Sequence, residues 1–184
     1  MTLSNIISNE PVDPQKITRA TQIISSLQEE LKIYITQGAG PFLAAIYDDK
    51  GTLIAKAANS VVHENCSHCH AEMNAIKQAE EKLNTYDLAP HHLSLYVTAE
   101  PCLMCLGGIM WSGIGAVYYG VPSKQVEEIT GFDEGFKPNW QDEFKKRGIT
   151  VYGNLAPEKG QEVLREYVRQ GHRVYKPTRD FDKM

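Results

Sequence analysis

Two kinds of apolar pattern follow one another along this chain. In residues 13–38 apolar positions recur at helical spacing, and the opening Asp13-Pro14 pairs a capping residue with a proline suited to the first helical turn. The apolar face of this predicted helix is Ile17, Ala20, Ile24, Leu27, Leu31 and Tyr34. Apolar runs at 41–47 and 52–58, separated by a polar turn that contains glycine, predict a β-hairpin. The residues up to about Val12 show neither pattern, and we expect them to be loose.

Strand and helix patterns alternate beyond the hairpin. Predicted strands lie at 93–98, 116–121 and 149–152, and predicted helices at about 69–83, 101–113, 123–130, 141–147 and 157–170. This alternation is typical of an α/β fold in which helices flank a central sheet, and right-handed connections make its later strands parallel. A length of 184 residues suits one domain. We expect a single domain, 1–184, with a core at about 15–155 and a C-terminal helix and tail at 156–184.

Two short motifs hold the candidate chemistry. They are His70-Ala71-Glu72 and Pro101-Cys102-Leu103-Met104-Cys105, and 28 residues separate Glu72 from Pro101. His70, Cys102 and Cys105 are good zinc ligands, and catalytic zinc sites use three protein ligands and keep one open position. Glu72 is a hard ligand beside two thiolates and is better suited to carry protons for water at the metal. A structural zinc knuckle, completed by one more Cys or His, is the alternative.

The spacing of these residues agrees with a metal site. Cys102 and Cys105 are three residues apart, so they share one face of a helical first turn, and Pro101 is tolerated there. His70 and Glu72 stand at the start of another predicted helix. Two helix N-termini would then point at one metal and favour the thiolates. We therefore expect one Zn²⁺ per chain.

Composition and charge narrow the function classes. The net charge is −4, which argues against a general nucleic-acid-binding protein. No apolar run approaches the roughly 20 residues of a membrane helix, and Met1–Asn9 does not resemble a signal peptide. The four cysteines form two C-x-x-C pairs, which favours metal binding in a reducing, cytoplasmic compartment over disulfides. We expect Cys66 and Cys69 to be free thiols in a loop, because Cys69 directly precedes His70.

The H-x-E and P-C-x-x-C motifs, in this order and at this chain length, resemble the cytidine-deaminase-like superfamily of zinc deaminases. The resemblance is strongest over residues 38–121. It implies a three-layer α/β/α sandwich with a central mixed five-stranded sheet. It also implies that His70, Cys102 and Cys105 hold the zinc, while Glu72 moves a proton from water to a ring nitrogen of the substrate.

Three segments resemble guanine deaminases within this superfamily. They are Gly40-Pro41-Phe42, Met110-Trp111-Ser112-Gly113 and Gly131-Phe132-Asp133-Glu134-Gly135. The resemblance implies hydrolysis of guanine to xanthine and ammonia, with Glu134 as a second catalytic proton carrier. The implied substrate-binding residues are Asn59, Phe42, Ala71, Trp111 and Tyr175. It further implies a homodimer in which the C-terminal segment is exchanged and covers the neighbouring site.

Other functions stay open at this point. An adenosine deaminase acting on a tRNA anticodon has the same zinc motif, but it must bind a polyanion and usually presents a basic surface. Another nucleoside or aminopurine deaminase, or a non-catalytic zinc protein, is also compatible with parts of the pattern. Glu72 argues against the non-catalytic protein, because a structural zinc does not need it. The sequence leaves open which ring is the substrate and whether loop 131–140 closes as a lid.

Overall fold

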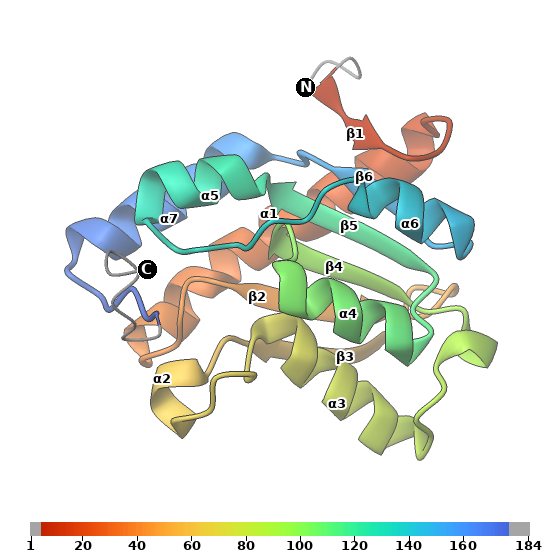
Figure 1. The fold of residues 1–184 in the computed structure, drawn as a ribbon, viewed down its shortest axis with the longest axis horizontal. Helices are drawn as coiled ribbons and strands as arrows, with labels where there is room; N and C mark the ends of the chain where they lie inside the picture. Colours follow the sequence, from red (N-terminus) through yellow and green to blue (C-terminus); the bar gives the residue numbers. More distant parts are fainter. Residues whose placement is uncertain (1–4, 177–184) are drawn as a thin grey trace, which may run out of the picture.

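One six-stranded sheet forms the centre of the computed structural model, which describes residues 5–176 (Figure 1). The strand order is β1-β6-β5-β4-β2-β3. The strands are β1 (Ile7–Ser8), β2 (Leu43–Tyr47), β3 (Leu53–Ala58), β4 (Ser94–Ala99), β5 (Ala116–Val121) and β6 (Thr150–Gly153). The predicted hairpin is confirmed, since β2 pairs antiparallel with β3, and the later strands β4, β5 and β6 are parallel as expected.

The sheet has one strand more than the predicted five. The additional strand β1 lies in the segment that we expected to be loose, and it pairs antiparallel with β6 through Ile7 and Gly153. Asn9 extends this contact, because its side chain donates to the Ile149 carbonyl over 3.0 Å and accepts from the Val151 amide over 2.8 Å. Two residues are too few to show the alternating pattern of a strand in the sequence. The strand β1 is recognised only from its pairing with β6.

The helices largely follow the predicted positions. They are α1 (Pro14–Thr36), α2 (Val61–Glu64), α3 (Ala71–Leu83), α4 (Leu103–Ser112), α5 (Ser123–Thr130), α6 (Trp140–Lys146) and α7 (Pro157–Arg169), with a 3₁₀ turn at Ala89–His91. Asp13 caps α1 by accepting from the amides of Gln15 and Lys16. The short helix α2 was not expected, because the segment carrying it showed no helical period. Within the described residues, no helix is long and apolar enough to span a membrane.

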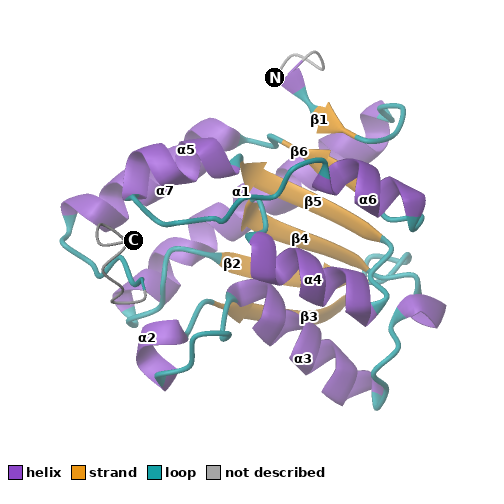
Figure 2. Cartoon of the chain, viewed as in Figure 1, coloured by secondary structure: helices purple, strands orange, loops and turns teal. Residues whose placement is uncertain are grey.

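Two apolar cores give the three-layer arrangement, shown by secondary structure in Figure 2. On one face of the sheet α3, α4 and α6 bury Ile76, Ile109 and Phe144. On the other face α1, α5 and α7 bury further apolar residues, including Ile24, Val126 and Leu164. Strand β5 supplies both cores, since its successive side chains point to opposite faces. The three-layer α/β/α prediction is confirmed.

The C-terminal helix packs within its own chain. Val163, Leu164 and Tyr167 of α7 are buried in the same core as α1 and α5. After α7 the described chain returns towards the end of the sheet and reaches Lys176. Residues 177–184 of the predicted tail lie outside the described residues. Exchange of the segment 156–184 between subunits stays a prediction.

Replacing Gly153 by alanine should strongly destabilise the fold. A Cβ at Gly153 would overlap the ring of Tyr119, which is fully buried on β5. Forced overpacking of this kind costs about 3 kcal/mol. We expect the urea midpoint of Gly153→Ala to fall accordingly. Gly115→Ala is the matched control, because its Cβ would meet only the Leu93 carbonyl oxygen at 3.8 Å. Equal midpoints for both variants would contradict the proposed overlap.

Candidate functional site

His70 and Cys102 each cap a helix at the same end of the sheet. His70 precedes α3 and Cys102 precedes α4, both with extended backbone, and neither side chain makes a capping hydrogen bond. Their side chains are therefore available to face one another. Interaction with Cys105 and then with His70 lowers the pKa of Cys102 to about 4, against the opposing effect of burial. The positive ends of the two helices also favour a thiolate here.

The three predicted ligands form a compact triangle. The Cys102 Sγ lies 3.5 Å from His70 Nδ1, the Cys105 Sγ lies 3.6 Å from the same nitrogen, and the two sulfurs are 3.6 Å apart. Tetrahedral zinc with ordinary bond lengths requires about 3.6 Å between nitrogen and sulfur and about 3.8 Å between two sulfurs. The donor atoms therefore fit one face of a zinc tetrahedron, and the fourth corner is not taken by any side chain of this group.

Glu72 lies beside these ligands but is not one of the three grouped donors. It is the second residue of α3, its side chain is only 5% exposed, and it lines the cavity described below. Burial, followed by the nearby Cys102, raises the pKa of Glu72 to about 7. A carboxyl group that titrates near neutral pH can both accept and release a proton.

A loop far along the chain brings Glu134 to the same place. The Glu134 carbonyl accepts a hydrogen bond of 3.1 Å from the amide of Leu103, the first residue of α4, and its amide donates to the Glu127 side chain. The loop is thus attached to the helix that carries Cys105. The Glu134 side chain is 6% exposed, and burial raises its pKa to about 8, although Lys137 acts in the opposite direction.

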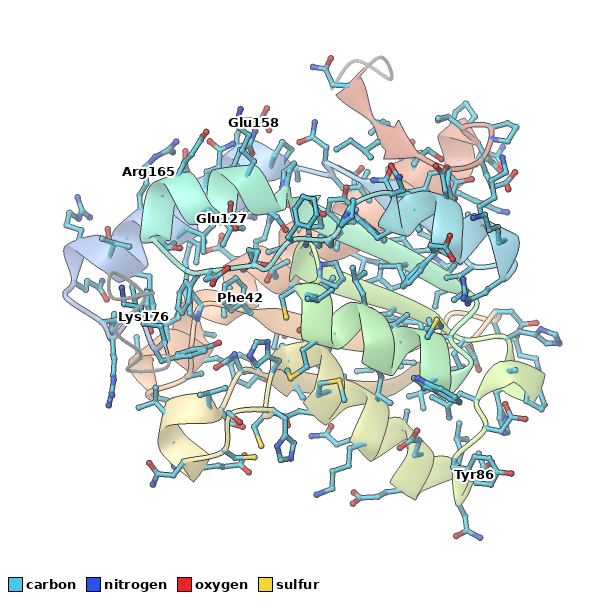
Figure 3. The ribbon with its side chains drawn as sticks, viewed as in Figure 1. Phe42, Tyr86, Glu127, Glu158, Arg165 and Lys176 are labelled. Atoms are coloured by element: carbon cyan, nitrogen blue, oxygen red, sulfur yellow. The ribbon has the colours of Figure 1, made fainter. Side chains whose placement is uncertain are left out.

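A cavity of about 740 Å³ connects these groups. Its lining includes Phe42, His70, Glu72, Cys102, Glu134 and Tyr175. Figure 3 labels two of the lining residues, Phe42 near the middle of the view and Lys176 at the side where the chain returns from α7. The volume is in the ordinary range for small-molecule sites, roughly 300–1,000 Å³. Two of the three metal-binding side chains, His70 and Cys102, therefore share one cavity with two buried carboxyl groups and aromatic walls, and Cys105 is buried behind them.

Comparison with known proteins agrees with this geometry. Residues 17–121, more than half of the chain, match the cytidine and deoxycytidylate deaminase zinc-binding region. The chain belongs to the cytidine and deoxycytidylate deaminase family. The matched region contains His70, Glu72, Cys102 and Cys105. The protein is therefore a zinc-dependent hydrolytic deaminase, and the predicted cofactor is confirmed at the level of the family.

Individual relatives of this deaminase include guanine and tRNA deaminases. Guanine deaminase from Bacillus subtilis is 41% identical over 124 residues, which are 64% of this chain and 77% of the relative. A guanine deaminase structure from Nitrosomonas europaea is 36% identical with a TM-score of 0.77 and covers 88% of this chain and 87% of its own. A structure of a tRNA A34 deaminase is 26% identical with a TM-score of 0.59, covering 74% of this chain and 94% of its own.

An ion pair that the sequence did not predict holds the Glu134 loop of the deaminase in place. The Lys137 Nζ lies 3.2 Å from a carboxylate oxygen of Glu100, and both side chains are almost completely buried. Glu100 also accepts from the Trp140 indole over 3.1 Å and from the Ser123 amide over 3.0 Å. Glu100 directly follows β4, so these contacts join the loop to the strand end beside Cys102. The partners are 37 residues apart, and no local pattern signals the pair.

Asn59 lies behind the cavity wall of the deaminase, where it contacts the lining residue Tyr175. Asn59 follows β3, its side chain is 1% exposed, and its amide donates to the Tyr175 hydroxyl over 2.6 Å. The Tyr175 ring packs edge-on against Phe132 at 5.0 Å, and Phe132 packs edge-on against Phe42 at 5.4 Å. Phe132 was not among the predicted site residues, although the segment that carries it was recognised. Tyr175 of the tail thus contacts the site of its own chain.

Two predicted substrate contacts, Trp111 and Ala71, are not among the residues that line the cavity, and their contact with a substrate stays a prediction. Trp111 is 83% exposed. It is six residues beyond Cys105 on α4, which places it about 9 Å further along the helix axis than this ligand. Ala71 lies between His70 and Glu72 as the first residue of α3, and it is fully buried. Neither side chain faces the cavity of its own chain.

Proposed function

We propose that this deaminase hydrolyses guanine to xanthine and ammonia. The observation that carries the proposal is the pair of buried carboxyl groups, Glu72 and Glu134, that line one cavity together with the zinc ligands His70 and Cys102. The greater coverage of this chain by the guanine deaminase structure supports the same substrate. A purine base is flat and mostly apolar on its faces, which suits a cavity walled by Phe42 and Phe132.

Two carboxyl groups can divide the proton transfers of this reaction. Water adds to C2 of guanine, the bond from C2 to the amino nitrogen breaks, and the oxygen stays on the ring as the C2 carbonyl of xanthine. Glu72 takes a proton from the attacking water and gives it to a ring nitrogen. Protonated Glu134 gives its proton to the departing amine and regains one from the hydroxyl group of the added water as the C2 carbonyl forms. Zinc held by His70, Cys102 and Cys105 supplies the positive charge that makes water a nucleophile near neutral pH.

The same cavity offers contacts that orient the base. The Asn59 amide can bond the edge of the ring once the Tyr175 hydroxyl releases it, and Phe42 and Tyr175 then contact the faces of the ring. The backbone at Ala71 and a partner's Trp111 complete the proposed set. In this arrangement Tyr175 must move for substrate to enter.

One observation favours a second candidate function, adenosine deamination in a tRNA anticodon. Arg173 and Lys176 line the cavity and could contact phosphate groups at its mouth. The net charge of −4 argues against extended contacts with a polyanion. The basic side chains at the cavity come only from a short segment of the tail. We therefore favour guanine over a tRNA anticodon as the substrate.

Ammonia release distinguishes these substrates. Purified zinc-loaded protein is incubated in parallel with guanine, adenine, cytosine, their nucleosides and a tRNA anticodon stem-loop. We expect release from free guanine, and no release after zinc is removed with a chelator. Release from the stem-loop alone would overturn the assignment and would make Arg173 and Lys176 the first residues to replace.

We also infer a homodimer that uses the exposed face of α4. Trp111 is 83% exposed there, and the exposed Leu103 lies two turns earlier on the same helix. Large aromatic residues at the centre of an interface commonly contribute 2 kcal/mol or more, roughly 30-fold in affinity. We expect Trp111→Glu to raise the dimer dissociation constant by at least about this factor in sedimentation experiments. Tyr86→Glu is the control, because Tyr86 is equally exposed but lies after α3 (Figure 3). A stable, fully active wild-type monomer would contradict the inference.

We infer a single domain over residues 1–184 and a cytoplasmic location. All four cysteines are free thiols, and a reducing compartment keeps such thiols reduced. Cell fractionation would test this location, and a thiol assay on the protein from each fraction would show whether its cysteines are reduced.

A further inference from the structure

A second group of metal-binding side chains lies outside the zinc triangle. It consists of Cys66, His68 and Cys69, whose donor atoms are all within 4.8 Å of one another. Residues 5–176 contain two such groups, and they share no member. The proposed reaction uses none of these three side chains. Their proximity within four consecutive residues therefore calls for a separate explanation.

The distances are those of a site for a thiophilic ion. The Cys66 Sγ lies 3.4 Å from each ring nitrogen of His68, and the Cys69 Sγ lies 3.7 Å from a carboxylate oxygen of Glu64. The corresponding edges of a tetrahedral zinc site are about 3.6 Å to 3.8 Å. We propose that Cys66, His68 and Cys69 form a second metal site for zinc or a similar soft divalent ion. The exposed Glu64 is not in this group, and its side chain would have to move to become the fourth ligand.

The backbone holds these ligands in place before an ion arrives. Asn65 follows helix α2 with left-handed backbone geometry, and the Cys66 amide donates to the Val61 carbonyl over 3.1 Å. The Cys69 amide in turn donates to the Cys66 carbonyl over 3.1 Å, which closes a tight turn between the two thiols. A turn that is already formed reduces the entropy lost when the ligands are ordered by a metal.

The donor set also selects the kind of ion. Two thiolates, an imidazole and one carboxylate suit zinc or another soft ion, whereas magnesium and calcium require mainly oxygen donors. The spacing of Cys66 and Cys69, with two residues between them, is common in structural zinc sites. Four protein ligands would close the coordination sphere, so this ion would be structural and would have no open position for water.

The two sites are separate although Cys69 and His70 are neighbours in sequence. The His70 Nδ1 is within 3.6 Å of both sulfurs of the first site, so this nitrogen is already directed to that ion. Asn65, Cys66 and Ser67 line the cavity, so the loop that would bind the second ion is also part of the cavity wall. The second ion would therefore hold this wall in position.

Zinc titration of the full-length protein tests the proposal. Metal-free protein is prepared with a reductant under inert gas, and bound metal is measured by competition with a chromophoric chelator and by elemental analysis. We expect wild type to bind about two zinc ions per chain and Cys66→Ser/Cys69→Ser about one. With cobalt, the thiolate charge-transfer absorbance of this double variant should fall to roughly half, since two of four thiolates are lost.

Control variants separate the two sites. His63→Ala removes an exposed histidine of α2 that is not in the group, and it should leave the stoichiometry of two unchanged. Cys102→Ser/Cys105→Ser should retain the ion of the second site. His68→Ala replaces an exposed side chain, so it can be used if the double variant Cys66→Ser/Cys69→Ser does not fold. It should raise the zinc dissociation constant of the second site at least tenfold.

Two results would overturn the proposal. One is a wild-type stoichiometry of one zinc per chain that Cys66→Ser/Cys69→Ser does not change. The other is a single bound zinc together with rapid loss of two thiols on mild oxidation, which would identify Cys66 and Cys69 as a redox pair. Neither result depends on deaminase activity, so the outcome is independent of the proposed substrate.

Discussion

Glu72→Gln should lower turnover by about 10³-fold while leaving the first zinc site filled. The carboxyl group of Glu72 is buried beside the metal ligands but is not among the donor atoms of their group. An amide has almost the same shape, so the packing at the start of α3 should persist. It cannot shuttle a proton, and loss of a general acid–base group commonly costs 10²- to 10⁴-fold in rate. We expect kcat to fall by about 10³-fold in the ammonia assay, with unchanged zinc content by elemental analysis.

Glu81→Gln is the matched control for this experiment. Glu81 lies on the same helix, but it is exposed and forms only a long surface ion pair with Lys77. Such pairs contribute little, so both activity and zinc content should stay at the wild-type level. If Glu72→Gln instead loses its zinc and Glu81→Gln does not, Glu72 is a metal ligand and its assignment as proton carrier is wrong.

Glu134→Gln should lower kcat by about 10²-fold and change KM little. The expected loss is smaller than for Glu72, because water can replace a proton donor to the amine more easily than the group that activates the nucleophile. The loop should keep its position, since the Glu134 backbone, and not its side chain, bonds Leu103 and Glu127. The ion pair of Lys137 with Glu100 holds the following residues independently. Steady-state kinetics with guanine give both constants.

Asp133→Asn is the control in the same loop. Asp133 precedes Glu134, lines the same cavity and accepts a hydrogen bond from the Gly135 amide over 2.9 Å. An asparagine oxygen can accept the same bond, so the loop should be preserved and kcat should change by less than about twofold. An unchanged kcat for Glu134→Gln would show that Glu134 is an ordinary buried loop acid. The proposal that guanine is the substrate would then lose the support that a second catalytic carboxyl group gives it.

The zinc centre could be predicted from sequence because its signals are local. His70 and Glu72 are two residues apart, Cys102 and Cys105 three apart, and each pair opens a helix whose period is visible in the sequence. The alternation of strands and helices then determines that both helices start at the same end of a mixed sheet whose later strands are parallel. The resemblance of loop residues 131–135 to guanine deaminases also predicted a catalytic role for Glu134.

The sixth strand and the surroundings of the zinc centre depend on contacts between residues far apart in sequence. The pairing of Ile7 with Gly153, the bond from Leu103 to Glu134 and the ion pair of Glu100 with Lys137 each join segments with no shared local pattern. Trp111 shows the opposite case, since a local resemblance suggested a substrate contact and the helix direction carries it away from its own cavity. Spacing along the chain therefore determined which residues form the zinc centre. Only tertiary packing determined what surrounds it, because the energies of these long-range contacts appear only once the sheet has assembled.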